Sequence, residues 1–565
     1  MKILRIDMST LTSKYEDLPE EWKIVGGRCL SAKILLDEVP PETDPLSAEA
    51  RLVLAAGPLA GTHAPSFGRM SVGAKSPLTM GIKEANVGGT LSQKLDRLGI
   101  RAIVVEGAPA DGKMHVAKIT KKEVSFEPAD DYVGMGTYPL SAALREKHHA
   151  KAGVISIGIA GERKQKSASV ALTDRDGHPA RHAARGGLGA VMGAKGLKAI
   201  VVDDRGTSIV KPTQRKAYMA TLKPWNKILD EDRGVQTMST TGTPGVLQPL
   251  SRMGSTPMQN YSGVPAEGIE GLYGDYIREV GDKRGGKMDA CMQGCMVKCT
   301  VVHNDAEGNH VTSALEYETL ALLGSNLGIG DADAVARFDR KCDDLGVDTI
   351  EVGSALGVAA GAGKFAMGDV AAVDALLDGI EKGTDDGNMI ANGVVNTAKA
   401  LGINRVPAFK GQAIPAHDPR VGKPTGVTYH TSPMGADHTA GLQYTMEDEG
   451  AVEHSLRAQI WNATLDSLGL CQFAISGDKN VTASFVKDLL NACHELSVTE
   501  QDIVNLGRDT LRAEVEFNKG AEIDDIDSGP DFVRSETLPP MGQVFGVDPA
   551  EMEKIWDNLD TIAVL

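Results

Sequence analysis

ARLVLAAGPLAG, at residues 50–61, has the pattern of a buried β-strand that is closed by glycine and proline. Three further runs of this kind are RAIVVEGAP (101–109), AGVISIGIAG (152–161) and LKAIVVDD (197–204). KITKKEVSFEP (118–128) alternates in polarity, which is typical of a half-buried hairpin. Because few long helical periods interrupt these strands, we expect an antiparallel or mixed β-rich domain.

The pattern changes near residues 205–212, and helical periods such as LEYETLALLGSNLG dominate the rest of the chain. A Pro/Gly-rich stretch at 408–426 indicates a second boundary. The expected fold class is therefore α+β. It consists of a β-rich domain at 1–208 followed by two mostly helical domains at 209–412 and 413–565.

Composition and charge exclude several classes of partner. The 565 residues are 42% hydrophobic and carry a formal net charge of −17, so neither nucleic acid nor an anionic membrane is an expected partner. No run approaches the roughly 18 apolar residues of a membrane helix. Arg5 and Asp7 interrupt what would be the apolar core of a signal peptide. The simplest expectation is a cytoplasmic protein.

Three of the seven cysteines lie within nine residues, in CMQGCMVKC (291–299). This C-x3-C-x3-C spacing of Cys291, Cys295 and Cys299 suits three corners of an iron–sulfur cluster. The alternatives are a zinc site, three cysteines on one helix face, and a radical-SAM site, whose C-x3-C-x2-C signature is one residue shorter. Cys471, which closes DSLGLC, is the natural fourth ligand; alternatively it is a buried free thiol.

Seven segments, in order, resemble the tungsten-dependent aldehyde:ferredoxin oxidoreductases, and the likeness covers roughly residues 1–520. The segments are GGRCLSAKILLDEVPPETDPLSAEARLVLAAGPLAGTHAPSFGRMSVGAKSPLTMGIKEANVGG (26–89), ARGGLGAVMGAKGLKAI (184–200), the cysteine cluster, LEYETLALLGSN (315–326), CDDLGVD (342–348), GADH (435–438) and DSLGLC (466–471).

The resemblance implies a fold and a set of cofactors. The front domain would form a saddle of two β-sheets that holds two pterins and one tungsten or molybdenum atom. Two helical domains would cover it, each supplying a DxxG turn to one pterin. The metal would take its sulfur ligands from the pterins and none from the protein. A magnesium ion would bridge the pterin phosphates, and the four cysteines would hold a [4Fe–4S] cluster.

Motif matches assign the cofactor-binding residues. Glycine-rich turns expose backbone N–H groups that suit phosphate, although any one of these turns alone is explained as a simple turn. DRLGI (96–100) also has the Asp-x-Leu-Gly pattern, and a glycine helix cap explains all its occurrences, so only the resemblance selects the other two. The residues assigned are Arg69, Asn86, Gly88, Gly89, Arg185, Gly186, Gly187, Asp343, Asp348, Asp466 and Gly469.

A carboxylate and an imidazole are the candidates for acid–base chemistry. Glu316 and Glu318 flank a tyrosine in a mostly apolar helix, which indicates that at least one is buried with a raised pKa. The resemblance favours Glu318 as general base, with Glu316 as the alternative. His438 of GADH matches the family's active-site histidine and would donate to the substrate oxygen, with His430 in reserve.

Three features depart from the family pattern. The first cysteine gap has three residues where the best-known members have two, and the C-terminus lacks their Tyr-Tyr and Arg-Gly-Trp segment. Arg337 and Arg340 lie where those members carry a Glu-x-x-His that binds an iron between subunits, so any homodimer should lack that iron.

The expected activity is oxidation of an aldehyde to a carboxylic acid, with electrons passed to ferredoxin or to an Fe–S partner subunit. One rival is a low-potential catalytic subunit of the benzoyl-CoA-reductase kind. Another is an Fe–S electron-transfer or scaffold protein that lacks the pterin.

Overall fold

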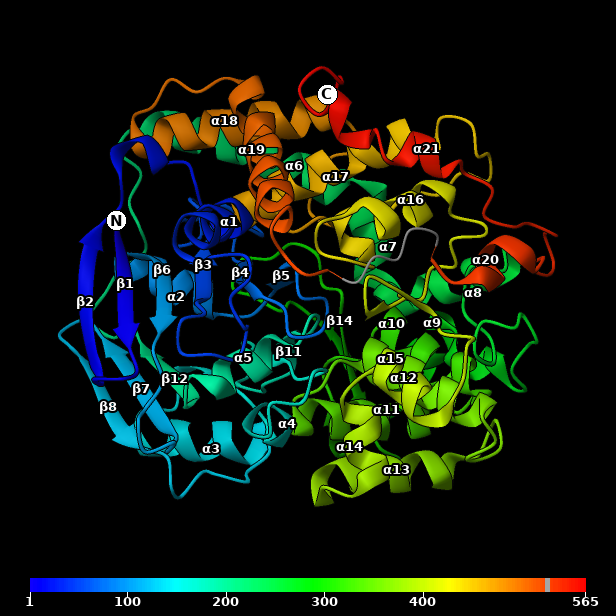
Figure 1. The fold of residues 1–565 in the computed structure, drawn as a ribbon. Coiled ribbons are helices and arrows are strands. Elements are labelled where there is room, and N and C mark those ends of the chain that lie inside the picture. The colour runs from blue at the N-terminus through cyan, green and yellow to red at the C-terminus, as the bar shows by residue number, and fades with distance from the viewer. Residues whose placement is uncertain (524–528) are drawn as a thin grey trace.

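The computed structural model describes residues 1–523 and 529–565. Its fold consists of a β-rich N-terminal region followed by a mostly helical remainder (Figure 1). This confirms the α+β expectation. Among the described residues, none of the helices combines the length and the hydropathy that a membrane crossing needs.

Two six-stranded mixed sheets make up the N-terminal region. The strands of the first sheet are β1 (Lys2–Asp7), β2 (Thr12–Asp17), β3 (Leu52–Ala56), β4 (Met70–Lys75), β5 (Ile82–Val87) and β6 (Ile100–Glu106). The strands of the second sheet are β7 (His115–Thr120), β8 (Val124–Pro128), β9 (Gly153–Ser156), β10 (Val170–Leu172), β11 (Arg181–Ala183) and β12 (Leu197–Asp203). The hairpin expected at 118–128 is the antiparallel pair β7–β8.

The two sheets share one topology. The first has the order β2-β1-β6-β3-β4-β5, and the second has β8-β7-β12-β9-β10-β11. Each sheet has one parallel pair, which joins the strand that comes first in the sequence to the strand that comes last: β1 to β6 in the first sheet and β7 to β12 in the second. The helices α1 (Gly27–Glu38) and α3 (Thr137–Lys147) occupy equivalent places, as do α2 (Leu91–Arg97) and α5 (Leu188–Ala194). The N-terminal region is thus an internal duplication.

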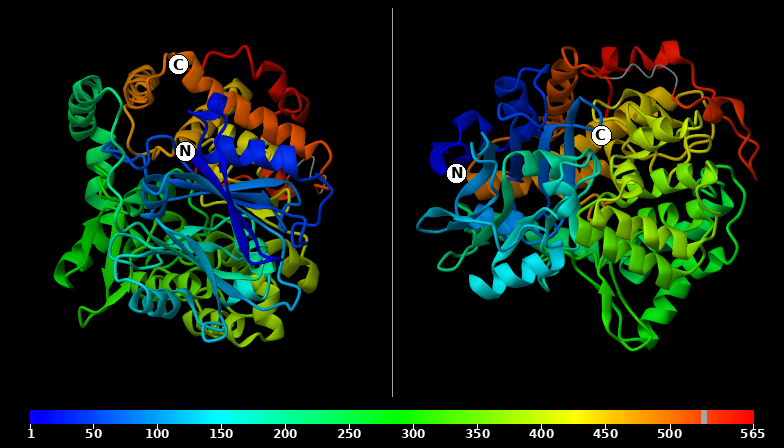
Figure 2. Two further views of the ribbon diagram at one scale, coloured as in Figure 1. Left: turned by 90° about the vertical axis from the view of Figure 1, so that its left-hand side faces the viewer. Right: turned by 60° about the horizontal axis from the view of Figure 1, so that its bottom comes forward.

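Alternation along the strands explains how these layers pack. In β6, Ile103 and Val105 point into a core shared by both sheets, whereas Ala102 and Val104 point to the opposite face. The helices α2 and α5 contact strands of both sheets and lie between them. The outer faces are covered by α1 on the first sheet and α3 on the second (Figure 2).

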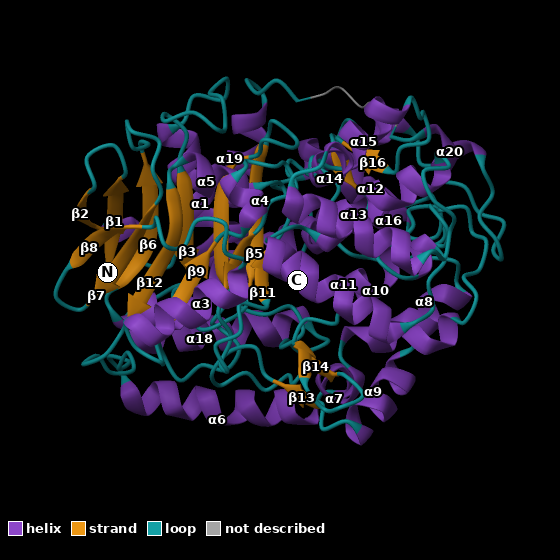
Figure 3. Ribbon diagram, turned by 90° about the horizontal axis from the view of Figure 1, so that it is seen from below, coloured by secondary structure: helices purple, strands orange, loops and turns teal. Residues whose placement is uncertain are grey.

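The rest of the chain is mostly helical and lies beside the sheets (Figure 3). Its longer helices are α6 (Arg215–Glu231), α7 (Arg233–Thr241), α9 (Gly274–Lys283), α11 (Ala332–Leu345), α12 (Thr349–Gly361), α13 (Val370–Lys382), α15 (Val394–Leu401), α16 (Lys423–Thr431), α17 (Ala451–Leu468), α18 (Lys479–His494) and α19 (Glu500–Asn518). Its shorter helices are α8 (Leu247–Arg252), α10 (Tyr317–Leu322), α14 (Asp385–Ala391), α20 (Asp531–Ser535) and α21 (Pro549–Met552).

Two small β elements interrupt the helices. A three-stranded sheet of β13 (Lys287–Asp289), β14 (Thr300–Asn304) and β15 (His310–Thr312) follows α9, and the hairpin β16 (Ala408–Phe409) with β17 (Gln412–Ala413) precedes α16. The cysteine segment 291–299 is a loop between β13 and β14. The alternative in which the three cysteines share one helix face is therefore wrong.

Two helix ends touch the sheets at equivalent glycines. Helices α17 and α11 end at the left-handed glycines Gly469 and Gly346. A Cβ built on Gly57, after β3, would lie 2.0 Å from the carbonyl oxygen of Leu468, the last residue of α17. A Cβ on Gly158, after β9, would lie 2.1 Å from the Leu345 oxygen at the end of α11. Each DxxG turn therefore packs backbone to backbone against one half of the duplication.

Replacing either docking glycine by alanine should destabilise the protein by about 1–3 kcal/mol, because the new methyl group overlaps a carbonyl that cannot rotate away. The measurement is the unfolding midpoint of Gly57→Ala and Gly158→Ala. The control is Gly281→Ala within α9, where a Cβ would meet nothing within 4 Å and alanine should stabilise the helix slightly. Equal midpoints for all three variants would contradict the docking.

Candidate active site

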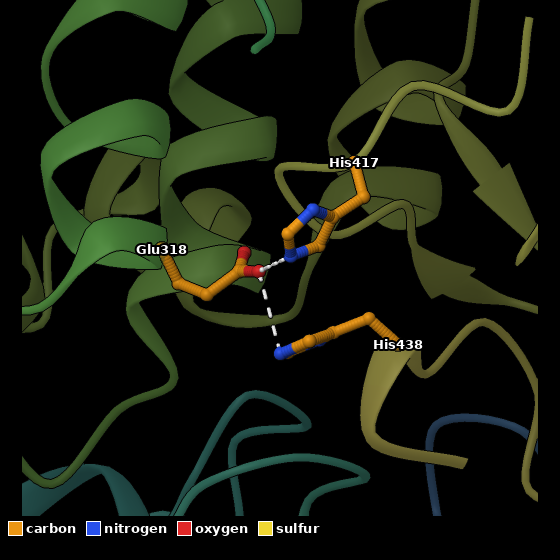
Figure 4. Close-up of side chains that lie close together, drawn as sticks. All are labelled: Glu318, His417 and His438. Carbon is orange, nitrogen blue, oxygen red and sulfur yellow. Dashed lines mark ion pairs between the residues drawn. The ribbon is translucent and has the colours of Figure 1, made fainter. Parts of the chain in front are cut away.

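Glu318 lies in the first turn of α10, and its carboxylate faces two imidazoles (Figure 4). Its Oε1 atom is 2.9 Å from Nε2 of His417 and 3.4 Å from Nε2 of His438. Its Oε2 atom accepts a 2.7 Å hydrogen bond from the backbone N–H of Ala416. Together with the near-complete burial of His417, these contacts fix the carboxylate between the two rings.

His438 is positioned by the aspartate that precedes it. Asp437 caps a short 3-10 helix, His438–Ala440, by accepting a 3.0 Å hydrogen bond from the N–H of Thr439. Its other oxygen is 2.5 Å from the ammonium of Lys83, a fully buried side chain on β5. Asp437 therefore ties the GADH turn to the first sheet, and the Nδ1 atom of His438 is buried without a hydrogen-bond partner.

His417 lies on the loop between β17 and α16, and sequence reasoning did not select it. The Tyr444 hydroxyl hydrogen-bonds to its Nδ1 atom, and the ring of Tyr317 lies 5.1 Å from its ring, centroid to centroid. Tyr429 donates to the His417 carbonyl at 3.1 Å, and Tyr261 donates to the Ile414 carbonyl at 2.6 Å. Four tyrosines thus hold this loop against Glu318.

Glu318, His417 and His438 are also the one group of three His, Cys, Asp or Glu side chains, among the described residues, with ligand atoms all within 4.8 Å of one another. Oε1 of Glu318 lies next to the Nε2 atom of each imidazole. A carboxylate flanked by two imidazoles can exchange protons, and the same three groups are also metal ligands.

The pKa of Glu318 corrects one expectation. Burial tends to raise it, but the nearby imidazoles of His438 and His417 outweigh burial and lower it to about 2. The raised pKa expected for this carboxyl is therefore wrong, and Glu318 is ionised at neutral pH. Burial lowers the pKa of His438 below its ordinary value and favours the neutral imidazole.

The two alternatives from the sequence lie elsewhere. Glu316 precedes α10, its side chain is 45% exposed, and its carboxylate is 2.9 Å from the guanidinium of Arg181. His430 packs between the rings of Phe409 and Phe545. The structure brings together Glu318 and His438, and it brings neither Glu316 nor His430 to them.

The four candidate cysteines converge on one place. Ser66 joins their two segments, because its hydroxyl is 3.3 Å from Sγ of Cys295 and its carbonyl accepts a 3.1 Å hydrogen bond from the N–H of Cys471. The hydrogen bond from Cys295 is the main cause that lowers the pKa of Cys291, with Arg181 and Arg69 adding to it. Four thiols with arginines beside them form a donor set that suits an iron–sulfur cluster.

The glycine-rich turn after β5 lies directly against this sulfur cluster. Arg69 donates to both the side chain and the backbone carbonyl of Asn86. A Cβ on Gly88 would lie 3.0 Å from Sγ of Cys291, and Gly89 has a left-handed φ of +109°. Larger side chains at this turn would fill the space beside the thiols.

Asp343 and Asp466 are the carboxylates of the two docked DxxG turns; Asp343 is buried, and the Asp466 side chain is 15% exposed. Oδ2 of Asp343 has no hydrogen-bond partner, and its Oδ1 is 3.2 Å from Nε2 of His182. Burial raises the pKa of Asp343, and it raises that of Asp466 to about 6 against the attraction of Arg28. Buried acceptors of this kind require donors, and the N–H edges of two pterins would supply them.

The third Asp-x-Leu-Gly segment is different. Asp96 accepts a 2.9 Å hydrogen bond from the N–H of Gly61 and lies 3.8 Å from Arg101. A Cβ on Gly99 would meet nothing within 4 Å, so no backbone packs against this glycine as it does against Gly469 and Gly346. The turns of Asp343 and Asp466 therefore pack against a glycine at the end of a sheet strand, and the turn of Asp96 does not.

Asp348 and the second glycine-rich turn are already engaged by the protein. Asp348 caps α12 through Oδ1 and lies 3.2 Å from the guanidinium of Arg185 through Oδ2. Arg185 also donates to the Ala413 carbonyl at 2.7 Å. Gly186 and Gly187 both have left-handed φ values, +84° and +75°. These residues shape the wall between the second sheet and the loop of His417.

Comparison with known proteins identifies the family. Residues 3–204 match the model of the aldehyde ferredoxin oxidoreductase N-terminal domain, and residues 220–558 match the model of domains 2 and 3. The chain belongs to the aldehyde ferredoxin oxidoreductase family. It is accordingly an oxidoreductase, and the resemblance noted in the sequence is confirmed.

Relatives within and near the aldehyde ferredoxin oxidoreductase family share most of the chain. A tungsten-containing aldehyde ferredoxin oxidoreductase of Pyrococcus furiosus is 31% identical over 573 residues, covering 95% of this chain and 90% of the relative. An aliphatic sulfonate oxidoreductase, WOR-like subunit, of the same organism is 26% identical over 483 residues, covering 78% and 74%. The active site complex BamBC of benzoyl coenzyme A reductase superposes with a TM-score of 0.81 at 18% identity, covering 99% and 93%, and shares the fold.

Proposed function

We propose that this protein oxidises an aldehyde to a carboxylic acid at a tungsten or molybdenum atom held by two pterins. The observation that carries the proposal is the meeting of Glu318 with His438, a carboxylate and an imidazole, in a member of this family. The reaction converts RCHO and water into RCOO⁻, three protons and two electrons.

The residues present fit the implied cofactors. Asp343 and Asp466 would accept from one pterin each, and the turns at Gly88–Gly89 and Gly186–Gly187 would face the pterin phosphates and their magnesium. The four cysteines would hold a [4Fe–4S] cluster. When bound, the metal–pterin group supplies two-electron redox chemistry and the cluster supplies a one-electron path to ferredoxin or an Fe–S partner subunit.

The directions of the two pKa shifts support His438, rather than Glu318, as the group that accepts and donates the proton. The imidazoles lower the pKa of Glu318 and weaken it as a base, whereas burial favours the neutral imidazole of His438, so we assign the general-base role expected for Glu318 to His438 instead. His438 would take the proton from the attacking water, and the ionised Glu318 would stabilise the resulting imidazolium. The imidazolium would then donate to the substrate oxygen.

A substrate comparison tests the proposal. Anaerobically purified protein should reduce a viologen dye when supplied with aldehydes, and should not do so with an aliphatic sulfonate. Under a strong reductant it should leave an aryl-CoA thioester unreduced. Turnover of the sulfonate or the thioester with no turnover of any aldehyde would replace this proposal with one of those activities.

Glu318→Gln should reduce kcat by about 10²–10⁴, because it removes the charge that stabilises the His438 imidazolium. Glu316→Gln is the matched control from the same segment. Its carboxylate is 45% exposed and pairs with the buried Arg181 instead of an imidazole, so kcat should fall far less. A larger loss in the Glu316 variant would contradict the assignment.

The same assignment fixes the acid limb of the pH profile. Because burial lowers the pKa of His438, the neutral imidazole persists below pH 6.5, the ordinary pKa of histidine. The value of kcat/KM should be constant above the lowered pKa of His438 and should fall as the pH drops through it. The imidazoles lower the pKa of Glu318, so its ionisation lies further to the acid side than that of an ordinary glutamate. The His438→Gln variant should lack this limb.

Cys471→Ala should lose or convert the cluster, because it removes one of four converging thiols. Wild-type protein should contain about four iron atoms per chain. Cys493→Ala is the control, because it also removes a buried thiol of α18 and leaves in place the backbone carbonyl that accepts a hydrogen bond from Thr213. A full cluster spectrum in the Cys471 variant would contradict the ligand assignment.

A further inference from the structure

Three side chains of the candidate active site present metal-binding atoms to one another (Figure 4). Oε1 of Glu318 is 2.9 Å from Nε2 of His417 and 3.4 Å from Nε2 of His438. In spite of these short distances, Oε1 is buried and makes no hydrogen bond with the described residues. Burial of a carboxylate oxygen without a hydrogen bond is costly, and a cation bound to it would offset that cost.

The distances between these atoms suit a shared metal ion. Zn²⁺ lies about 2.0–2.1 Å from an imidazole nitrogen or a carboxylate oxygen. Two ligand atoms that are about 2.1 Å from one ion are about 3.0 Å apart at a right angle and about 3.4 Å apart at the tetrahedral angle. The two separations in the structure, 2.9 Å and 3.4 Å, lie close to these values. One ion can therefore bind all three atoms after small side-chain movements.

The other nitrogen of each imidazole faces an oxygen atom outside the group. Nδ1 of His417 is hydrogen-bonded to the hydroxyl of Tyr444, and Nδ1 of His438 is 4.0 Å from Oδ1 of Asp437. Histidines that bind a metal usually direct their second ring N–H to such an oxygen, which fixes the tautomer whose Nε2 lone pair is free. Both rings are therefore arranged as metal ligands with Nε2 beside Glu318.

The ligand types and the nearby charges select the class of ion. Two imidazoles and one carboxylate suit divalent transition metals such as zinc, whereas Mg²⁺ and Ca²⁺ prefer oxygen ligands alone. Lys83 lies 2.5 Å from Asp437. Arg185 lies 3.2 Å from Asp348. These ion pairs offset the repulsion that the two cationic side chains would exert on an ion at Glu318.

We propose that Glu318, His417 and His438 bind one divalent transition-metal ion, with Zn²⁺ as its probe, and that this ion inhibits the enzyme. It is distinct from the tungsten or molybdenum atom and from the iron of the cluster. The ion exchanges three of its water ligands for Oε1 and the two Nε2 atoms, and nothing is oxidised or reduced. It thereby occupies the lone pair with which His438 would accept a proton. The binding follows from the geometry alone, whereas the inhibition rests on the proposed function.

Zinc binding is measured first, on anaerobically purified holoenzyme that has been exchanged into metal-free buffer. About one Zn²⁺ per chain should bind without loss of iron, tungsten or molybdenum, and an excess of Mg²⁺ should not displace it. X-ray absorption at the zinc edge should show only nitrogen and oxygen ligands, at about 2.0–2.1 Å. Absence of binding, or a sulfur ligand at about 2.3 Å, which would place the ion on cysteines, would overturn the proposal.

Matched variants then test the ligands one at a time. His417→Ala removes one donor atom, and Glu318→Gln removes the charge of another. Each should weaken zinc binding by more than the about 10–100-fold that loss of an outer hydrogen-bond partner costs. The controls are His430→Ala and Glu316→Gln, which remove an imidazole and a carboxylate outside the group and should bind zinc as the wild type does. Equal affinities in the ligand variants and their controls would overturn the site.

Inhibition is measured as aldehyde turnover at rising zinc concentration, and each protein is compared with its own rate without zinc. The wild type should lose turnover over the range in which zinc binds and regain it when a chelator is added. His417→Ala should require at least about 100-fold more zinc. Full turnover with zinc bound at the site would overturn the inhibition. Zinc bound to these ligands in a protein that oxidises no aldehyde would support the site and reject the proposed function alone.

Discussion

Two backbone contacts determine how the helical part of the chain meets the sheets. The carbonyls of Leu468 and Leu345 lie so close to Gly57 and Gly158 that no side chain fits between them. Each contact holds a helix end with an aspartate two positions before its last residue, Asp466 in α17 and Asp343 in α11. Because the two sheets share one topology, the contacts are equivalent, and each half of the duplicated scaffold docks one of two matched turns.

Strand β5, at the edge of the first sheet, connects the functional groups that these turns surround. Lys83 holds the aspartate beside His438, Asn86 binds Arg69 next to the cysteines, and the following Gly88 lies against Cys291. Glu84, between them, is buried near Asp466, and burial raises its pKa to about 8. A single strand therefore sets the relative positions of the acid–base pair, a DxxG turn and the thiols.

Local patterns predicted the fold well, because β-branched runs, a hairpin alternation and helical periods each encode one element. They also marked the four cysteines, which lie together. They did not reveal the duplication, because the two halves agree in strand order rather than in residues. His417 was missed because it occurs in a Pro/Gly-rich stretch that reads as a boundary, and only tertiary contacts with tyrosines place it on Glu318. The pKa of Glu318 was predicted in the wrong direction, because the neighbouring imidazoles that lower it are distant in sequence.

The proposed function requires the duplicated sheets and their two docked turns to hold two pterins around one metal atom. The ratio of pterin to tungsten or molybdenum in protein purified without oxygen tests this requirement. About two pterins and one such metal atom per chain are expected, in addition to the iron of the cluster. One pterin per metal atom, or iron without either metal, would contradict it.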